Sequence, residues 1–137
     1  MGPLLFAIGG MIIAAMGFLH GVFTARDEVT PKVLAPRDPK VLQAMQGARL
    51  GIARDTDLWR AWLGFNHSHP LGAMVFGLGC AVIGLFYPLA LEEPLVLIAA
   101  PIIALIYLVL AVRYWFRTPA IGIAVALAFI IAGVLTA

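Results

Sequence analysis

Four stretches of this chain are apolar over a length that can cross a lipid bilayer, which takes about 20 helical residues. They lie near residues 3 to 24, 59 to 87, 95 to 115 and 119 to 136. Hydrophobic residues make up 63% of the 137-residue chain and charged residues only 12%, far from the usage of soluble proteins. We therefore expect an all-α, polytopic integral membrane protein, a bundle of four transmembrane helices forming a single membrane domain over residues 1–137.

The first stretch is expected to remain as a span. Residues 1–25 have no basic n-region, and no clean small-x-small cleavage site precedes Arg26, so the features of a cleaved signal peptide are missing.

The basic residues indicate an orientation. Arg113 and Arg117 flank the last connection between spans, whereas the middle connection carries Glu92 and Glu93 and no basic residue. The other seven surround the first connection: Arg26, Lys32, Arg37, Lys40, Arg49, Arg54 and Arg60. The positive-inside rule then predicts a cytoplasmic loop over residues 25–58 and both termini outside. The basic residues are dispersed and accompany no recognition motif, so we expect the lipid bilayer and no nucleic acid as partner.

The cytoplasmic loop contains one predicted helix. Asp38 and Pro39 form an N-cap and first-turn pair, and apolar residues then recur at helical spacing from Val41 to Ile52, into a region loosened by Gly47 and Gly51. This short amphipathic helix can lie on the anionic leaflet or cap the bundle. The preceding VTPKVLAPRDP predicts an extended linker. Asp55 and Asp57 are expected to cap the second span.

The stretch FNHSHPLG, residues 65 to 72, places four polar side chains in consecutive positions within an apolar span. It holds the only Asn, the only Ser and two of the three His. At 100° per residue, Asn66 and His69 share one face, whereas His67 lies about 160° away from His69. A kink at Pro70 can bring His67 nearer the interior. The shared face continues through Trp62, Ala73, Gly77, Cys80 and Gly84. Small residues let neighbouring helices approach closely, so this is the expected packing face, with the Cys80 thiol as inert packing.

Pro70 also predicts a specific need. It has no N–H to donate to the carbonyl of Asn66, so that acceptor loses its helical partner. Within lipid it must be bonded by a neighbouring helix or by water.

The first span supplies a neighbour for this cluster. His20 stands six residues before Arg26, or about 9 Å along a helix, and His69 stands nine residues after Arg60, or about 13 Å. Because the two spans run antiparallel, both imidazoles lie at comparable depth. His20 shares its face with Thr24. We expect His20, Asn66 and His69 to meet between the first two spans.

Two functions remain open for these three residues. As structural groups they join the first span to the second by hydrogen bonds. As a cofactor- or ligand-binding site, His20 and His69 would hold a haem or another metal, or His69 and Asn66 would bind a quinone-like headgroup. Neither the cofactor nor a metal is identified by the sequence. A proton relay lacks an acid within any predicted span.

Catalysis finds little support, and the sequence leaves enzyme activity undecided. Ser68 is flanked by His67 and His69, but adjacent helical residues do not face one another and no G-x-S-x-G context exists. No pair of carboxylates is placed for acid and base chemistry.

The layout WRAWLGFNHSHPLG after QAMQGARLGIARDTDLW resembles a group of small, uncharacterised bacterial inner-membrane proteins with four spans. The matching residues are Trp59, Trp62, Gly64, Phe65, Asn66, Ser68 and His69. The resemblance covers the first two spans and implies a location in the bacterial inner (plasma) membrane, with no known activity.

We expect a small non-catalytic membrane protein, a structural or accessory subunit of a membrane assembly. The alternative is an intramembrane ligand- or cofactor-binding protein that uses His20 and His69. Glycine-rich faces offer a route to a homo-oligomer, although packing within one bundle is the preferred use of them. These faces are Gly10, Ala14, Gly17 and Gly21 on the first span and Ala73, Gly77 and Gly84 on the second.

Overall fold

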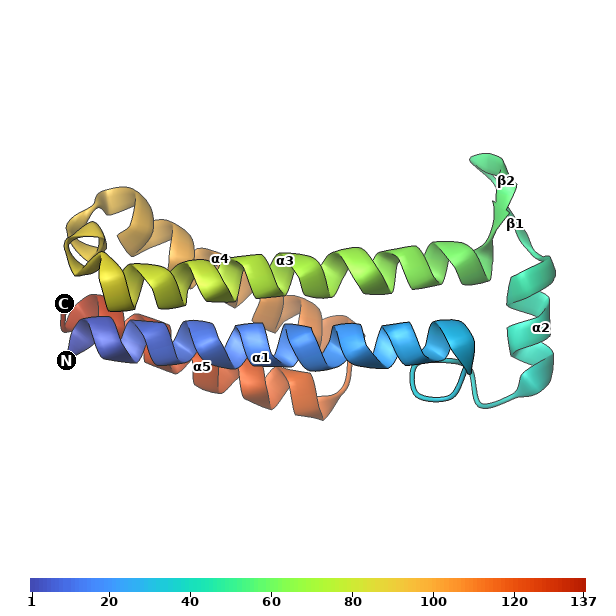
Figure 1. Ribbon diagram of the computed structural model, residues 1–137, viewed down its shortest axis with the longest axis horizontal. Coiled ribbons are helices and arrows are strands. Elements are labelled where there is room, and N and C mark those ends of the chain that lie inside the picture. The colour runs from blue at the N-terminus through green and yellow to red at the C-terminus, as the bar shows by residue number, and fades with distance from the viewer. The chain divides into compact units, whose positions relative to one another are not determined.

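A computed structural model describes residues 1–137, and the protein is almost entirely helical. In chain order the elements are α1 (Gly2–Val29), α2 (Pro39–Gly47), β1 (Arg49–Leu50), β2 (Ala53–Asp57), α3 (Leu58–Phe86), the 3-10 helix η1 (Pro88–Glu92), α4 (Pro94–Tyr114) and α5 (Arg117–Leu135) (Figure 1).

Four of these helices, α1, α3, α4 and α5, are long and apolar enough to cross a membrane. The prediction of four such helices is confirmed. Three of them match their predicted bounds closely, but α1 continues to Val29, five residues beyond the predicted end. Asp27 and Glu28 are therefore helical.

The chain divides into two compact units, each described separately. The first unit comprises residues 1–16 and 73–137, and the second comprises residues 17–72.

In the first unit, α1 and α3 approach each other at their glycines. A Cβ atom added to Gly77 would lie 2.5 Å from the backbone oxygen of Gly10, and one added to Gly10 would lie 2.6 Å from the Cβ atom of Cys80. Gly84 likewise adjoins the carbonyl of Pro3. The predicted packing face of the second span is confirmed here, and Gly10 and Gly77 are used within the bundle.

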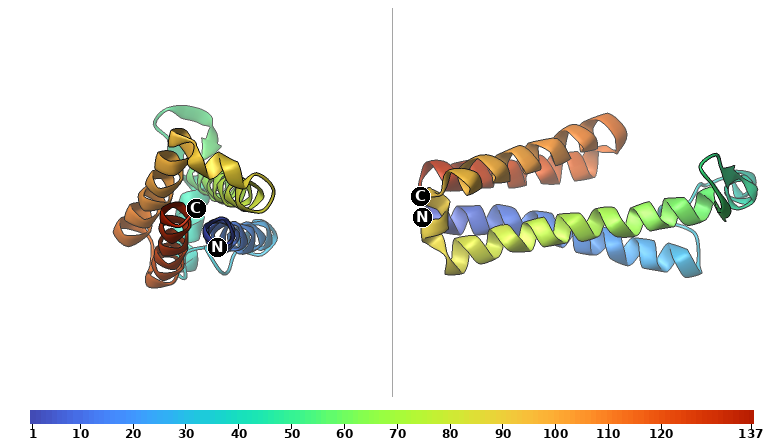
Figure 2. Two further views of the ribbon diagram at one scale, coloured as in Figure 1. Left: turned by 90° about the vertical axis from the view of Figure 1, so that its left-hand side faces the viewer. Right: turned by 90° about the horizontal axis from the view of Figure 1, so that it is seen from above.

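The helix α5 completes this packing through small residues. A Cβ atom on Gly9 would lie 2.7 Å from a side-chain carbon of Ile130, and one on Gly133 would lie 2.6 Å from the backbone nitrogen of Phe6. Gly2 meets Ala137 in the same way, so the two ends of the chain are adjacent (Figure 2). Figure 2 also shows α4 and α5 side by side.

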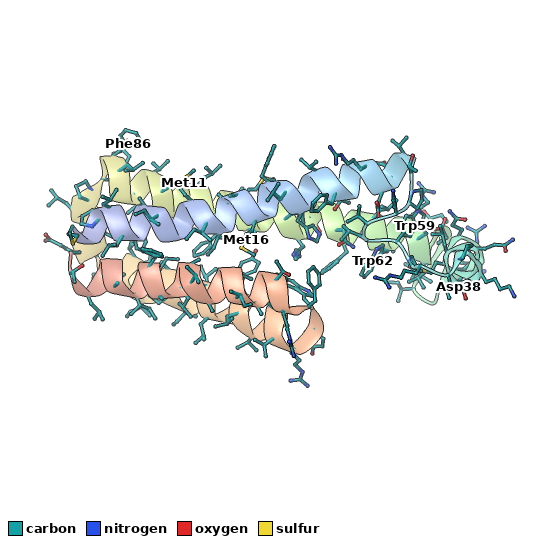
Figure 3. All side chains as sticks on the ribbon, turned by 90° about the horizontal axis from the view of Figure 1, so that it is seen from below. Met11, Met16, Asp38, Trp59, Trp62 and Phe86 are labelled. Carbon is teal, nitrogen blue, oxygen red and sulfur yellow. The ribbon has the colours of Figure 1, made fainter.

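The outer surface of the first unit is apolar. Met11 is 49% exposed and Phe86 70% exposed, and Figure 3 shows the Phe86 side chain pointing away from the ribbon. The fully buried positions include Phe6, Leu91 and Ile130. An apolar exterior around a packed interior is what a bilayer-embedded bundle requires, because its solvent is hydrocarbon.

In the second unit, α2 runs across the ends of the neighbouring long helices (Figure 1). Asp38 caps it, since its carboxylate accepts a hydrogen bond from the backbone N–H of Lys40 at 2.9 Å. This confirms the predicted start. No residue of α2 is buried.

Two predictions for this loop are wrong. Helical structure stops at Gly47, and the chain then forms the antiparallel hairpin β1–β2 with Ile52 in its turn. Two glycines within five residues weaken helix formation, and the short strands gain a hydrogen-bonded ladder instead. The supposed extended linker is also a folded loop, because residues 32–35 close around Asp27. Of the two predicted caps, Asp57 caps α3 and accepts from the backbone N–H of Arg60 at 2.8 Å, whereas Asp55 lies within β2.

Candidate functional site

His20, Asn66 and His69 meet in the second unit, as the sequence predicts. The Nε2 atom of His20 lies 3.0 Å from Oδ1 of Asn66. The rings of His20 and His69 stack with centroids 4.9 Å apart and planes inclined by 20°. Asn66 is 4% exposed, while both histidines are half-buried. The structure brings these residues together but leaves their role as a cofactor site a prediction.

The amide of Asn66 determines the proton position on His20. Asn66 Nδ2 donates to the carbonyl of Trp62 at 2.8 Å, which turns Oδ1 toward the imidazole. Because this oxygen can only accept, the bonded Nε2 of His20 carries the hydrogen. His20 is therefore held as a hydrogen-bond donor by an amide that is fixed by its own helix.

Thr24 is a member of the cluster that sequence reasoning did not assign. Its hydroxyl lies 3.1 Å from the carbonyl of Asn66 and 3.0 Å from the carbonyl of His20, and its side chain is fully buried. The Asn66 carbonyl is the one deprived of its helical donor by Pro70. The predicted need for a partner from a neighbouring helix is met by Thr24. The available signal was its spacing of four residues from His20 on one helical face. We call His20, Thr24, Asn66 and His69 the polar cluster.

His67 points elsewhere. Its Nε2 atom lies 3.4 Å from a carboxylate oxygen of Glu28, with both side chains largely exposed. The edge of His69 instead meets Phe65, at a centroid distance of 5.5 Å. The helical-wheel prediction that His67 and His69 cannot address one site therefore agrees with the structure.

Asp27 is the second polar residue that the sequence did not single out. It is fully buried, and its carboxylate accepts hydrogen bonds from four consecutive backbone N–H groups. The donors and distances are Lys32 at 3.1 Å, Val33 at 2.8 Å, Leu34 at 2.6 Å and Ala35 at 2.8 Å. These bonds offset the cost of burying a charge and fix the loop after α1.

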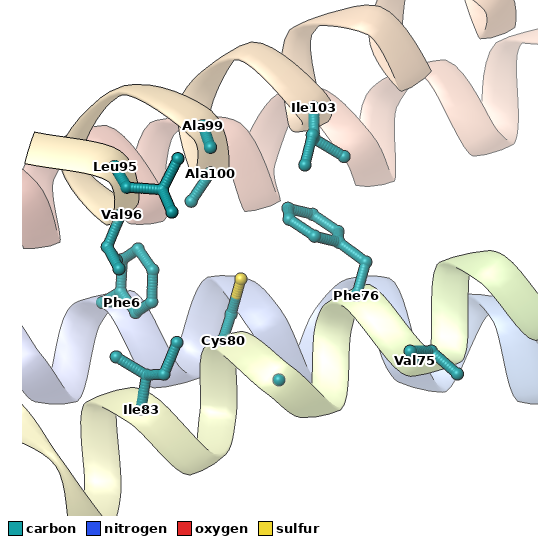
Figure 4. Close-up of a pocket in the computed structure, with 11 residues that line it drawn as sticks. Phe6, Val75, Phe76, Cys80, Ile83, Leu95, Val96, Ala99, Ala100 and Ile103 are labelled. Carbon is teal, nitrogen blue, oxygen red and sulfur yellow. The ribbon is translucent and has the colours of Figure 1, made fainter. Parts of the chain in front are cut away.

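The first unit contains an apolar cavity of about 230 Å³ (Figure 4). Its walls include Phe6, Phe76, Cys80, Ile83, Val96 and Ala100. A ligand site normally combines apolar walls with a few polar groups that orient the ligand. This cavity has no such groups, so the polar cluster is the stronger candidate site.

The polar cluster offers limited ligation chemistry. No group of three or more His, Cys, Asp or Glu side chains gathers in a way that could hold a metal ion. His20 and His69 would need further ligands from outside the chain to complete a metal site.

Comparison of the chain with protein-family models, with curated proteins and with solved structures finds no match.

Proposed function

We propose that this protein is a small, non-catalytic integral membrane protein, a structural or accessory subunit of a bacterial inner-membrane assembly. In this proposal the polar cluster holds the first span against the second and so sets the shape that the subunit presents to its partners.

One observation carries the proposal: His20, Thr24 and Asn66 are joined by hydrogen bonds, and His69 stacks on His20. The hydroxyl of Thr24 reaches the carbonyl that Pro70 deprives of a donor, and Asn66 bonds both His20 and its own helix. No buried side-chain nitrogen or oxygen in the structure lacks a partner. Groups that are already paired favour a structural role, since a ligand would have to replace bonds that exist.

The proposed orientation rests on charge. The basic connection over residues 25–58 is cytoplasmic and both termini lie outside, by the positive-inside rule. The contact of Gly2 with Ala137 supports a common side for the two termini.

The structural role of the polar cluster is tested by measuring stability. We expect Asn66→Ala and His69→Leu each to lower the free energy of unfolding in detergent by about 0.6–1.7 kcal/mol, the range for polar contacts between membrane helices. Ser68→Ala is the matched control, because the exposed Ser68 hydroxyl bonds only within its own helix turn, to the carbonyl of Phe65. Unchanged stability in both cluster variants would contradict the structural role.

The accessory role needs its own measurement. Extraction from native membranes into polymer-bounded discs, followed by mass determination, is expected to recover the chain together with other membrane proteins. Recovery of the chain alone as a monomer would contradict the assembly part of the proposal.

A second candidate function is the binding of a quinone-like headgroup. The observation that favours it is the group of rings formed by the half-buried His20 and His69 and the exposed Phe65, against which a planar ring can stack. Axial haem ligation fits less well, because both imidazoles must direct a nitrogen at one iron. In the stack they face each other instead, and His20 Nε2 already bonds Asn66.

An absorbance spectrum with mass analysis of extracted lipids separates the candidates. A quinone retained by the purified protein and lost in His69→Leu would replace the structural proposal with the ligand-binding one. A Soret band lost in the same variant would establish haem.

A further inference from the structure

The second unit carries an excess of uncompensated positive charge. No ion pair joins any of its seven Lys and Arg side chains to an acid, and the one ion pair found there is between His67 and Glu28. Three of its remaining acids bind backbone N–H groups instead: Asp27, Asp38 and Asp57. With seven basic and five acidic side chains, the second unit keeps a net positive charge that can attract an anionic surface.

The hairpin β1–β2 carries Arg49 and Arg54 beside an apolar tip, together with Asp57, which caps α3, and the exposed Asp55. Ile52 is 97% exposed in the turn. The guanidinium of Arg49 in β1 donates to the backbone carbonyl of Arg54 in β2 at 2.9 Å. The exposure of Ile52 to water is costly, because a fully buried Ile side chain gains about 1.5–3 kcal/mol over an exposed one.

The position of the hairpin in the second unit suits contact with a leaflet. Figure 1 shows it extending sideways from the start of α3, so that its tip stands to the side of the first turns of that helix. Arg60, the third residue of α3, marks the point at which charge first appears on that helix. With α3 crossing a bilayer in the proposed orientation, a tip at this level would overlie the surrounding lipid. The helix α2, with Val41 47% exposed and no buried residue, adds a second unpacked apolar face.

We infer that the β1–β2 hairpin is a membrane-surface contact that recognises anionic lipid headgroups. Arg49 and Arg54 bind headgroup phosphates, and Ile52 enters the interfacial region between them. The combination follows the general rule for interfacial segments, in which apolar insertion and attraction to anionic lipid act together. This inference does not depend on the role of the polar cluster.

A fluorescent label on the turn tests the inference. Gly51→Cys leaves Ile52 in place and meets no atom within 4 Å, and a Cys80→Ala background removes the only other thiol. The labelled protein is reconstituted into nanodiscs of phosphatidylcholine, alone or mixed with phosphatidylglycerol, containing a spin-labelled quencher lipid. We expect stronger quenching in the anionic discs, reversed at about 1 M salt, where the Debye length falls to about 3 Å.

Matched variants separate the tip from general electrostatics. Arg54→Gln keeps the bond from Arg49, because only the backbone of Arg54 accepts it, and is expected to lower the ratio of lipid-bound to free tip about five-fold. Ile52→Ser is expected to reduce quenching in both lipids. Arg37→Gln, which removes an exposed arginine outside the hairpin, is the control and should change little.

Three results would overturn the inference. The first is a label unquenched in both kinds of disc, and the second is equal quenching with and without phosphatidylglycerol. The third is an equal loss in Arg37→Gln and Arg54→Gln, which would assign the effect to net charge rather than to the hairpin.

Discussion

The hydroxyl of Thr24 lies 3.1 Å from the carbonyl oxygen of Asn66, the acceptor that Pro70 deprives of its helical hydrogen bond. The same hydroxyl is 3.0 Å from the carbonyl of His20, but that carbonyl belongs to an unbroken stretch of α1. A threonine on one helix thus compensates for a proline on its neighbour. The proline is tolerated in α3 because the partner helix supplies the missing donor.

This relationship predicts a coupled pair of substitutions. Thr24→Val removes the hydroxyl at nearly constant volume and should lower the free energy of unfolding by about 0.6–1.7 kcal/mol. Pro70→Ala returns an N–H to position 70, so that Asn66 regains a donor within α3. We expect Thr24→Val to cost markedly less in the Pro70→Ala background, as measured by SDS titration in mixed micelles.

Thr24→Ser is the control for this cycle, since it keeps the hydroxyl and should lose little stability. Equal costs of Thr24→Val in the two backgrounds would mean that the Asn66 carbonyl is not its significant partner.

A second prediction concerns the loop that closes around Asp27. Asp27→Asn keeps the shape but removes the charge and one acceptor oxygen, so several of the four backbone bonds are lost. Hydrogen bonds to a charged group contribute about 1.5–3 kcal/mol each, and 1.4 kcal/mol is a tenfold change in an opening equilibrium. Trypsin should therefore cleave after Lys32 and Arg37 at least about ten times faster.

The neighbouring acid provides the matched control for that experiment. Glu28→Gln makes the same change of charge at an exposed side chain whose partner, His67, is also exposed. Surface pairs of this kind contribute about 0–1 kcal/mol. Cleavage should stay near the wild-type rate, and similar acceleration in both variants would show that charge, rather than the carboxylate's backbone contacts, protects the loop.

The meeting of His20, Asn66 and His69 could be predicted because it depends on regular geometry. Two long apolar helices fix the angular positions of their residues, and the distance of each histidine from the nearest basic residue fixes its depth. The need of the Asn66 carbonyl followed from the chemistry of Pro70 alone.

The structure of residues 25–58 could not be predicted in the same way. The bonds to Asp27 come from four backbone groups of a loop, and no side-chain pattern records where a backbone N–H points. The apolar residues up to Ile52 fit a helical period, yet Gly47 and Gly51 destabilise a helix there, and the chain forms a hairpin instead. Helical spacing over so short a segment does not distinguish a helix from a helix followed by a turn.

The glycines of α3 provide a final prediction that separates packing within the bundle from self-association. A Cβ atom on Gly77 would lie 2.5 Å from the backbone of both Gly10 and Ala14, whereas one on Gly79 meets nothing within 4 Å. Backbone cannot move aside without separating the helices, so Gly77→Ala should lower the free energy of unfolding by about 1–3 kcal/mol. Gly79→Ala should be neutral or stabilising by up to about 1 kcal/mol, since Ala favours helix over Gly. SDS titration measures both, and sedimentation in detergent follows the mass. If Gly77→Ala instead changed the oligomeric mass and left the stability of the monomer intact, the face would serve contact between chains, because overpacking inside a bundle must weaken the bundle itself.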